Sequence, residues 1–362
     1  MQGSHQDVTT GGAPTLPRVA ELYDPKGQFD VRIEDVRDPA APGPDEVILE
    51  VIRAAICGTD AAEWDHGPVL CRPGVVLGHE FVGRVVEVGD GVTALRAGDR
   101  VVSGAGISCG RCRWCLRGRT NLCAAYRTLG LQVDGGLAEY VVSPASICHP
   151  VPAGCDDDAA AMAQPLAVAL HALSRAAQGP DDAVAVIGAG GIGSFIVAGA
   201  ARRTVGGRVV AIDVDRSRLA TATALGATDT ADATGRDLVE LLLELSDGRG
   251  FDVVVESSGA PQAPAGAVAG ACRGGRVLLV GLHGAPRELD LTRMILREVD
   301  LVTTVAHVAD SDVPAALELL ATSDVAAVTA GARIPLEALV DEGLRPLAER
   351  RAAGKILVTP RA

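Results

Sequence analysis

The sequence predicts an α/β protein that combines a doubly wound parallel sheet with a second, mostly β part. Between residues 183 and 280, short apolar strands alternate with helices, which is typical of a parallel sheet covered by helices on both faces. Before residue 150, by contrast, β-rich runs follow one another with only Gly and Pro residues between them. The length of 362 residues also favours two domains over one.

The β-rich runs are short and bounded by turn residues. We expect strands at Val47–Val51, Val82–Val88, Val101–Ser103 and Ala138–Val142. A single Ala-rich helix is expected over residues 156–177, because Asp residues occupy its first turn, where the helix dipole favours negative charge.

The region that follows alternates regularly between strands and helices. Strands are expected at Ala183–Ile187, Arg208–Ile212, Asp252–Val255 and Arg276–Val280. Helices are expected at Gly191–Thr204, Arg216–Leu225, Asp237–Leu245 and Pro264–Cys272. A helix at Val313–Ala321 and a strand at Gly354–Thr359 complete the chain.

Composition excludes several classes of protein. With 33 Lys and Arg against 46 Asp and Glu, the net charge of −13 disfavours binding to nucleic acid or to an anionic membrane. No window approaches 18 apolar residues in a row, so we expect no membrane span. Residues 1–15 are polar and lack the apolar segment of a signal peptide, which predicts a flexible tail and a cytoplasmic protein with reduced cysteines.

A glycine-rich turn follows the expected strand Ala183–Ile187. Its Gly188-x-Gly190-x-x-Gly193 spacing opens a helix, and Asp213 follows the next strand, 20 residues past Gly193. This context matches the dinucleotide-binding fingerprint of a Rossmann fold, although an ordinary tight turn is the alternative. We expect the cofactor's pyrophosphate at this turn, against Gly188, Gly190, Gly191, Ile192 and Gly193.

Asp213 is expected to accept hydrogen bonds from the adenosine ribose. Because its charge would repel a 2′-phosphate, NAD is favoured over NADP as the cofactor. Arg216 and Arg218 lie close enough in sequence to tolerate a phosphate, and Arg218 is a candidate cofactor-binding residue. The more common interpretation of both arginines is an exposed helix face.

Four cysteines lie close together in a loop that is rich in arginine. Cys109, Cys112, Cys115 and Cys123 have the spacing C-x2-C-x2-C-x7-C, which suits a closed, four-thiolate structural zinc site. The same ligands could hold an iron–sulfur cluster. We therefore expect a metal-binding lobe at about residues 105–125. The other cysteines, Cys71, Cys148, Cys155 and Cys272, show no ligand spacing and are expected to be buried small side chains.

Two further motifs make a family resemblance visible. Cys57-Gly58-Thr59-Asp60 and Gly78-His79-Glu80 precede the four-cysteine loop, which in turn precedes the glycine-rich turn. This order resembles the zinc-containing medium-chain alcohol dehydrogenases, from Leu16 to Pro360. The segment Gln164–Leu173 resembles the branch of the polyol (sorbitol) and threonine dehydrogenases.

The resemblance implies a domain organisation and an assembly. It implies a GroES-like zinc catalytic domain at residues 16–165 and 307–362, interrupted by a Rossmann domain at 166–306. It also implies a homodimer or homotetramer assembled through the edge of the Rossmann sheet.

The resemblance further implies a second, catalytic zinc. Cys57 and His79 would be ligands, with Glu80 as either a ligand or a neighbour of one. Asp60 would orient the ligand His79, and Thr59 would receive the substrate proton. The expected reaction is hydride transfer between NAD and a small polar secondary alcohol or ketone: a polyol, cyclitol, sugar or amino alcohol.

The chain departs from the polyol-type pattern at Gln164, where those relatives carry Glu. An amide can bind zinc through its oxygen, hold a water molecule on the metal, or face the substrate; alternatively, the substitution weakens the metal site. Two other classes also remain open. One is a zinc-independent reductase of the same superfold, and the other is a dinucleotide-binding subunit without catalysis.

Overall fold

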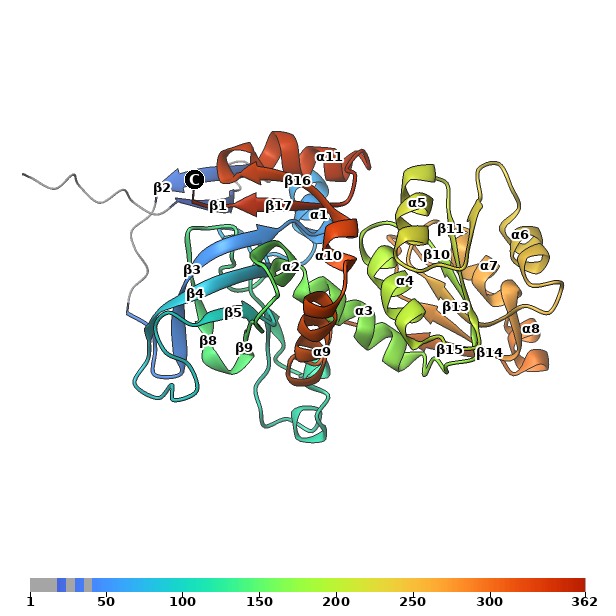
Figure 1. Cartoon of the computed structure of the whole chain (residues 1–362), viewed down its shortest axis with the longest axis horizontal. Coiled ribbons are helices and arrows are strands. Elements are labelled where there is room, and N and C mark those ends of the chain that lie inside the picture. Colours follow the sequence, from blue (N-terminus) through green and yellow to red (C-terminus); the bar gives the residue numbers. More distant parts are fainter. Residues whose placement is uncertain (1–17, 24–29, 36–40, 362) are drawn as a thin grey trace, which may run out of the picture.

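The computed structural model describes residues 18–23, 30–35 and 41–361. Two main sheets lie side by side, with helices α3 (Ala163–Arg175) and α9 (Ala309–Thr322) between them (Figure 1). The expected tail at residues 1–15 lies outside the described residues. Among the described residues, no helix combines the length and the apolar character needed to span a membrane.

The six-stranded sheet is entirely parallel, as the apolar strands predicted. Its order is β12-β11-β10-β13-β14-β15, so that the first strand in sequence lies at the centre and the order reverses between β10 and β13. The strands are β10 (Ala183–Ile187), β11 (Arg208–Asp213), β12 (Asp229–Asp232), β13 (Phe251–Glu256), β14 (Ala271–Leu279) and β15 (Asp300–Thr303). This is the order of a doubly wound dinucleotide-binding sheet.

Alternate residues of these strands are buried on opposite faces of the sheet. One set packs with α3, α4 (Gly191–Arg203) and α9, and includes Val184, Val186, Val209 and Ala211. The other set faces α6 (Leu238–Leu245) and α7 (Ala263–Gly270), and includes Ala185, Ile187, Val210 and Ile212. Helices α5 (Arg216–Ala224) and α8 (Leu291–Arg297) complete the two layers (Figure 1). Burial of both faces explains why the strands are continuously apolar.

The second sheet is mixed and has the order β16-β17-β3-β4-β5-β9, with β8 paired to β3. Its strands are β3 (Glu46–Ala55), β4 (Glu80–Val88), β5 (Arg100–Ser103), β8 (Tyr140–Pro144), β9 (Cys148–Pro150), β16 (Ala330–Pro335) and β17 (Lys355–Thr359). Strand β17 pairs antiparallel with β3, so the end of the chain completes a sheet that its first half began. Two small pairs accompany it: β1 (Arg18–Tyr23) with β2 (Asp30–Asp35), and β6 (Gly106–Ile107) with β7 (Arg127–Thr128).

The single helix expected over residues 156–177 is wrong. Helix α2 (Asp157–Ala161) ends at Met162, and α3 begins at Ala163. Pro165 has no amide hydrogen to donate to the carbonyl of Ala161, which explains why one continuous helix does not form there.

The remaining differences concern element ends, short elements and one cysteine. The strand expected at Ala138–Val142 is found two residues later, and β14 begins at Ala271, where the sequence predicted the end of a helix. Short elements such as α1 (Gly58–His66), α8, α10 (Val325–Thr329) and α11 (Arg345–Ala348) had no clear periodicity in the sequence.

Cys71, Cys148 and Cys155 are buried as expected, but Cys272 is only half-buried, because it lies near the beginning of β14.

Candidate metal centres and cofactor site

The pairing of β3 with β4 brings three potential metal ligands together. Cys57 caps the N-terminus of α1, two residues after β3 ends, while Glu80 is the first residue of β4 and pairs with Ala55. One donor atom each from Cys57, His79 and Glu80 lies within 4.8 Å of the others. This set of thiol, imidazole and carboxylate groups, in which His79 and Glu80 are buried and Cys57 is half-buried, suits zinc, so the residues present fit the metal implied by the sequence.

Asp60 lies behind this group and is fully buried. Its Oδ2 accepts a hydrogen bond from the Cys57 backbone N–H at 2.9 Å, and its Oδ1 lies 3.6 Å from His79 Nδ1. Burial raises the pKa of Asp60, against the opposing influence of His79. With Nδ1 directed at Asp60, Nε2 is the imidazole nitrogen left to bind a metal, which is the arrangement that carboxylates impose on zinc-bound histidines.

The charges around His79 oppose the effect of its burial. Burial lowers the pKa of His79, but the negative charges of Asp60 and Cys57 outweigh it and raise the pKa to about 10. A cation is therefore favoured at this position. A zinc ion would supply that charge and leave the imidazole neutral, as metal binding requires.

Thr59 follows Cys57 closely on the first turn of α1. Its hydroxyl oxygen lies 3.7 Å from Cys57 Sγ, next to the potential ligand set. This places Thr59 where the family resemblance expects the residue that receives the substrate proton, although that role remains a prediction.

The structure adds Lys355, which sequence reasoning missed. Its Nζ lies 2.5 Å from Glu80 Oε2; the Glu80 side chain is buried, and 11% of the Lys355 side chain is exposed. Burial lowers the pKa of Lys355, but Glu80 and Cys57 outweigh it and raise the pKa, so the lysine is a cation. A lone lysine opening an apolar strand gives no sequence signal for a partner 275 residues away.

Gln164 is the second residue of α3 and is half-buried. Helix α3 packs against β4, the strand that begins with Glu80. This packing brings α3, which carries Gln164, into the same region as β4. Whether Gln164 contacts the metal or the substrate stays a prediction.

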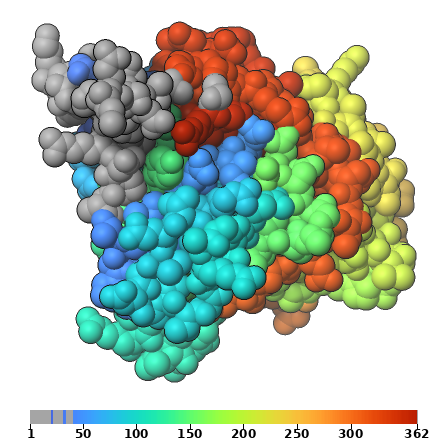
Figure 2. Space-filling model, turned by 60° about the vertical axis from the view of Figure 1, so that its left-hand side comes forward, coloured from blue at the N-terminus to red at the C-terminus, as the bar shows by residue number. Residues whose placement is uncertain are grey.

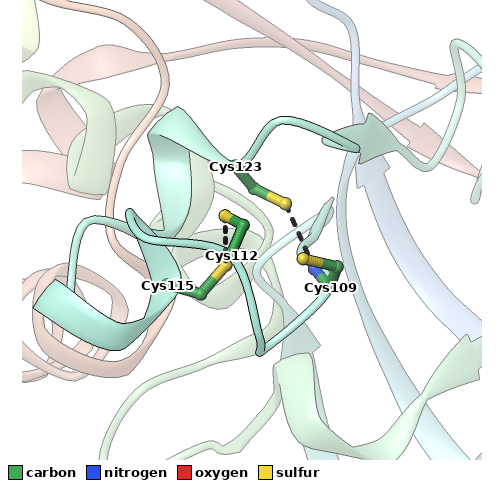
Figure 3. Close-up of side chains that lie close together, drawn as sticks. All are labelled: Cys109, Cys112, Cys115 and Cys123. Carbon is green, nitrogen blue, oxygen red and sulfur yellow. Dashed lines mark hydrogen bonds between the residues drawn. The ribbon is translucent and has the colours of Figure 1, made fainter.

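The four predicted cysteines converge in a separate lobe, which projects from the lower edge of the molecule (Figure 2). The sulfurs of Cys109, Cys112, Cys115 and Cys123 point toward one another (Figure 3) and lie within 4.8 Å of one another. Tetrahedral Zn–S bonds of about 2.3 Å place sulfurs about 3.8 Å apart, so this set fits zinc with little adjustment.

Backbone amides in this lobe stabilise the thiolate form of Cys112, which is the form that binds a metal. The N–H groups of Cys115 and Ala124 lower the pKa of Cys112 to about 6, which favours the thiolate needed for metal binding. Burial raises the pKa of Cys115 to about 11, and its sulfur also shares hydrogen bonds with Cys112 and Cys123. Zinc binding requires thiolates, so the metal would displace the protons of these thiols.

The glycine-rich turn joins β10 to α4 and forms the expected cradle. Gly188 has a φ of +91°, and a Cβ at Gly193 would lie 1.8 Å from the Gly188 carbonyl oxygen. At Gly191, the position of a Cβ faces open space. The first residues of α4, Gly191–Gly193, carry N–H groups without intrahelical acceptors, which suits an approaching pyrophosphate.

Asp213 is buried at the end of β11, next to this turn. Its Oδ2 accepts a hydrogen bond from Ala189 N–H at 2.7 Å, which ties the carboxylate to the glycine-rich turn. Arg218 is turned toward it, with Nη1 3.9 Å from Asp213 Oδ1, whereas the Arg216 side chain is 90% exposed. The exposed-face interpretation therefore holds for Arg216 and is wrong for Arg218, because the acidic groups of Asp213 and Asp215 attract its guanidinium.

A buried hydrogen-bond network connects the four-cysteine lobe to the helices between the two sheets. Asn121 of the lobe donates to the Val305 carbonyl at 2.9 Å and lies 3.3 Å from His171 Nε2. On its other side, His171 Nδ1 lies 2.9 Å from Asp312 of α9. His171 is thus a hydrogen-bonded structural residue.

Comparison with known proteins identifies both halves of the chain. The family model of the alcohol dehydrogenase GroES-like domain matches residues 43–153, and that of the zinc-binding dehydrogenases matches residues 191–322. A sorbitol dehydrogenase from Halalkalibacterium halodurans is 38% identical over 266 residues, which cover 72% of this chain and 76% of the relative. An L-threonine 3-dehydrogenase from Streptomyces coelicolor is 40% identical over 270 residues, covering 73% and 77% of the two chains.

The fold also matches solved structures over nearly its whole length. A zinc-binding dehydrogenase from Sinorhizobium meliloti, bound to NADP, superposes with a TM-score of 0.85 at 31% identity. The match covers 96% of this chain and all of the other.

We expect Cys112→Ser to remove about one zinc per chain and to lower the melting temperature, because the closed four-thiolate site contributes folding free energy. NAD affinity should change little, since the lobe is remote from the glycine-rich turn. Metal analysis and thermal melting check this, with Cys272→Ser as the control outside the lobe. Full zinc content with unchanged melting would contradict the assignment.

We expect Asp60→Asn to weaken zinc binding at the Cys57 centre by about 10- to 100-fold, because the amide cannot hold His79 as the carboxylate does. Competition with a chromogenic chelator measures this affinity. The matched control is Asp65→Asn on the same helix, where the side chain is 59% exposed and the surface pair with His66 contributes little. Equal zinc affinity in both variants would exclude the orienting role of Asp60.

Proposed function

Because the chain belongs to the zinc-containing medium-chain alcohol dehydrogenases, in the branch of the sorbitol and threonine dehydrogenases, we propose that it oxidises a polar secondary alcohol with NAD. The observation that carries the proposal is the buried group of Cys57, His79 and Glu80 beside Thr59. A zinc-independent reductase would not need this ligand set, and a subunit without catalysis would not need Thr59.

We assign two zinc sites to each chain. Cys57 and His79, with Glu80, would hold the catalytic ion, and the four cysteines of the lobe would hold the structural one. When bound, the catalytic zinc supplies Lewis acidity that makes an alcohol easier to deprotonate, and the nicotinamide accepts the hydride.

The chain's own residues then have distinct tasks. Thr59 would accept the alcohol proton at its hydroxyl oxygen and pass it toward the cofactor ribose. Asp60 holds the His79 ring from behind, and Lys355 neutralises Glu80 from the side of β17. The Gly188–Gly193 turn and Asp213 hold the cofactor across the end of the parallel sheet.

The substrate class follows from the relatives. Sorbitol is a polyol, and the hydroxyl group at C3 of threonine is a secondary alcohol beside a charged amino group. We therefore propose a polyol, cyclitol, sugar or amino alcohol as the substrate. Turnover measured across a panel of these alcohols, with zinc content recorded, tests the proposal; no turnover of any member by the fully zinc-loaded protein would reject it.

The domain division and location expected from the sequence are part of this proposal. The catalytic domain would comprise residues 16–165 and 307–362, and the cofactor domain residues 166–306. We also propose a cytoplasmic location, because all nine cysteines lie within the described residues and are free thiols, which suits a reducing compartment.

A homodimer or homotetramer is proposed through the edge of the parallel sheet. Strand β15 ends the sheet order, and α8 next to it exposes large apolar side chains. Exposed fractions are 62% for Leu291, 74% for Ile295 and 70% for Leu296. Such a patch beside an edge strand favours association with a second copy.

We expect NAD to be preferred over NADP, and Asp213→Ala to erode that preference. Loss of a charged acceptor for the ribose hydroxyls costs roughly 1.5–3 kcal/mol, or about 10- to 100-fold in NAD affinity. Binding titrations with both cofactors measure this, with the exposed Arg216→Ala as the control. Faster turnover of the wild type with NADP at equal low concentration would contradict the assignment.

We expect Gln164→Glu to bind zinc at least as tightly and to shift alcohol oxidation to higher pH. A negative charge beside the metal makes loss of the alcohol proton harder, and one unit of pKa corresponds to about 1.4 kcal/mol. Gln164→Ala should lower activity moderately without unfolding the protein.

The measurement for Gln164 is kcat/KM against pH at equal zinc content. A changed KM with an unmoved pH profile in Gln164→Glu would assign Gln164 to substrate contact and remove it from the metal's surroundings.

A further inference from the structure

A cavity outside both metal centres lies between the end of strand β9 and helix α9 (Figure 1). Its volume is about 450 Å³, and we call it the β9–α9 cavity. None of its lining residues belongs to a metal centre or to the glycine-rich turn. Sites for small molecules commonly have volumes of this order, so the cavity is large enough to hold a ligand of its own.

The walls of the β9–α9 cavity are mostly apolar. The segment in which β9 ends forms one wall, and one face of α9 forms the other. The apolar side chains are those of Pro150, Pro152, Ala153, Pro314, Leu317 and Ala321. Proline and alanine side chains lose almost no conformational freedom when a ligand packs against them, so these walls favour a flat, apolar molecular body.

Glu318 adds a negative charge to the wall that α9 forms. Its side chain is exposed, and its carboxylate makes no ion pair or hydrogen bond with any residue that the structure describes. Ala321 and Thr322, in the last turn of α9, also line the cavity. This turn contains no basic residue, so no side chain of the helix neutralises the negative end of its dipole.

The lining residues supply no cation to offset these charges. They include no Lys or Arg, and their one titratable base is His149. Burial lowers the pKa of His149, against the opposing charge of Asp310, so the imidazole is neutral. The β9–α9 cavity therefore combines apolar walls with a negative charge that none of its own residues neutralises.

These features favour one class of ligand. Glu318 and the carboxyl end of α9 would repel an anion. A neutral apolar molecule would displace water from the Glu318 carboxylate without replacing the lost hydrogen bonds. We propose that the β9–α9 cavity is a second ligand site for an organic cation, whose apolar body lies among the prolines and whose amidinium, guanidinium or ammonium group pairs with Glu318. This site needs neither zinc nor NAD and is separate from the proposed alcohol oxidation.

Three probes of similar shape but different charge test the inference. Benzamidinium is a cation, benzamide is neutral and benzoate is an anion, and all three carry the same phenyl ring. Ligand-observed NMR titration of the zinc-loaded protein at low ionic strength measures their dissociation constants. We expect benzamidinium to bind about three- to thirtyfold more tightly than benzamide, the combined range for an exposed ion pair and a helix C-terminus. Benzoate should bind most weakly.

Glu318→Gln tests the charge. We expect this variant to bind benzamidinium about two- to fivefold more weakly, the range for one exposed ion pair, and to bind benzamide like the wild type. Glu288→Gln is the matched control, because it removes the same charge from an exposed position in the loop between β14 and α8. It should bind all three probes like the wild type.

Ala153→Phe tests the location. Ala153 is exposed, so a phenyl ring at this position would fill part of the cavity without entering the protein core. We expect benzamidinium and benzamide to lose most of their affinity together, while the melting temperature without a probe stays that of the wild type.

Equal affinities of the wild type for benzamidinium and benzamide, or no binding of benzamidinium, would overturn the inference. Undiminished benzamidinium binding in Glu318→Gln or in Ala153→Phe would also overturn it, because the cation would then bind elsewhere on the protein. None of these results depends on turnover of an alcohol, so the proposed function is accepted or rejected by its own assay.

Discussion

The proposed catalytic centre depends on the position of β3 between β4 and β17. Antiparallel pairing sets Ala55 opposite Glu80, and the Ile56 N–H donates to the Ile356 carbonyl at 3.0 Å. Three parts of the chain that are far apart in sequence therefore bring Cys57, Glu80 and Lys355 to one end of the sheet. A register shift of one residue in either pairing would turn these side chains to the other face and dissolve the site.

Charge balance explains why so many ionisable groups can be buried there together. Ionised Cys57, Asp60 and Glu80 are negative and Lys355 is positive, which leaves two net negative charges for a divalent cation to neutralise. Buried charges are stable only when they are paired in this way. At the position beside the metal that we propose for Gln164, its neutral side chain would preserve the balance, whereas an acid would add a third net negative charge.

The two proposed metal centres differ in how far apart their ligands lie in the sequence. This difference determines how readily each centre could be predicted from the sequence alone. All four ligands of the lobe lie within residues 109–123, where chain connectivity alone keeps the sulfurs near one another. The proposed catalytic ligands come from the ends of β3 and β4, and Lys355 comes from the last strand. Motif spacing could place Cys57, His79 and Glu80 together only through resemblance to a family, and nothing in the spacing could add Lys355.

The sequence by itself determined the parallel sheet, the glycine-rich turn with Asp213, and the four-cysteine lobe, because each depends on periodicity or spacing within a few tens of residues. Tertiary structure decided the pairing of Lys355 with Glu80. It also decided the hydrogen-bond network in which Asn121 of the lobe meets His171 and Val305. These features arise where strands or turns from distant segments meet, and a single buried charge or histidine acquires its partner only once the sheets have formed.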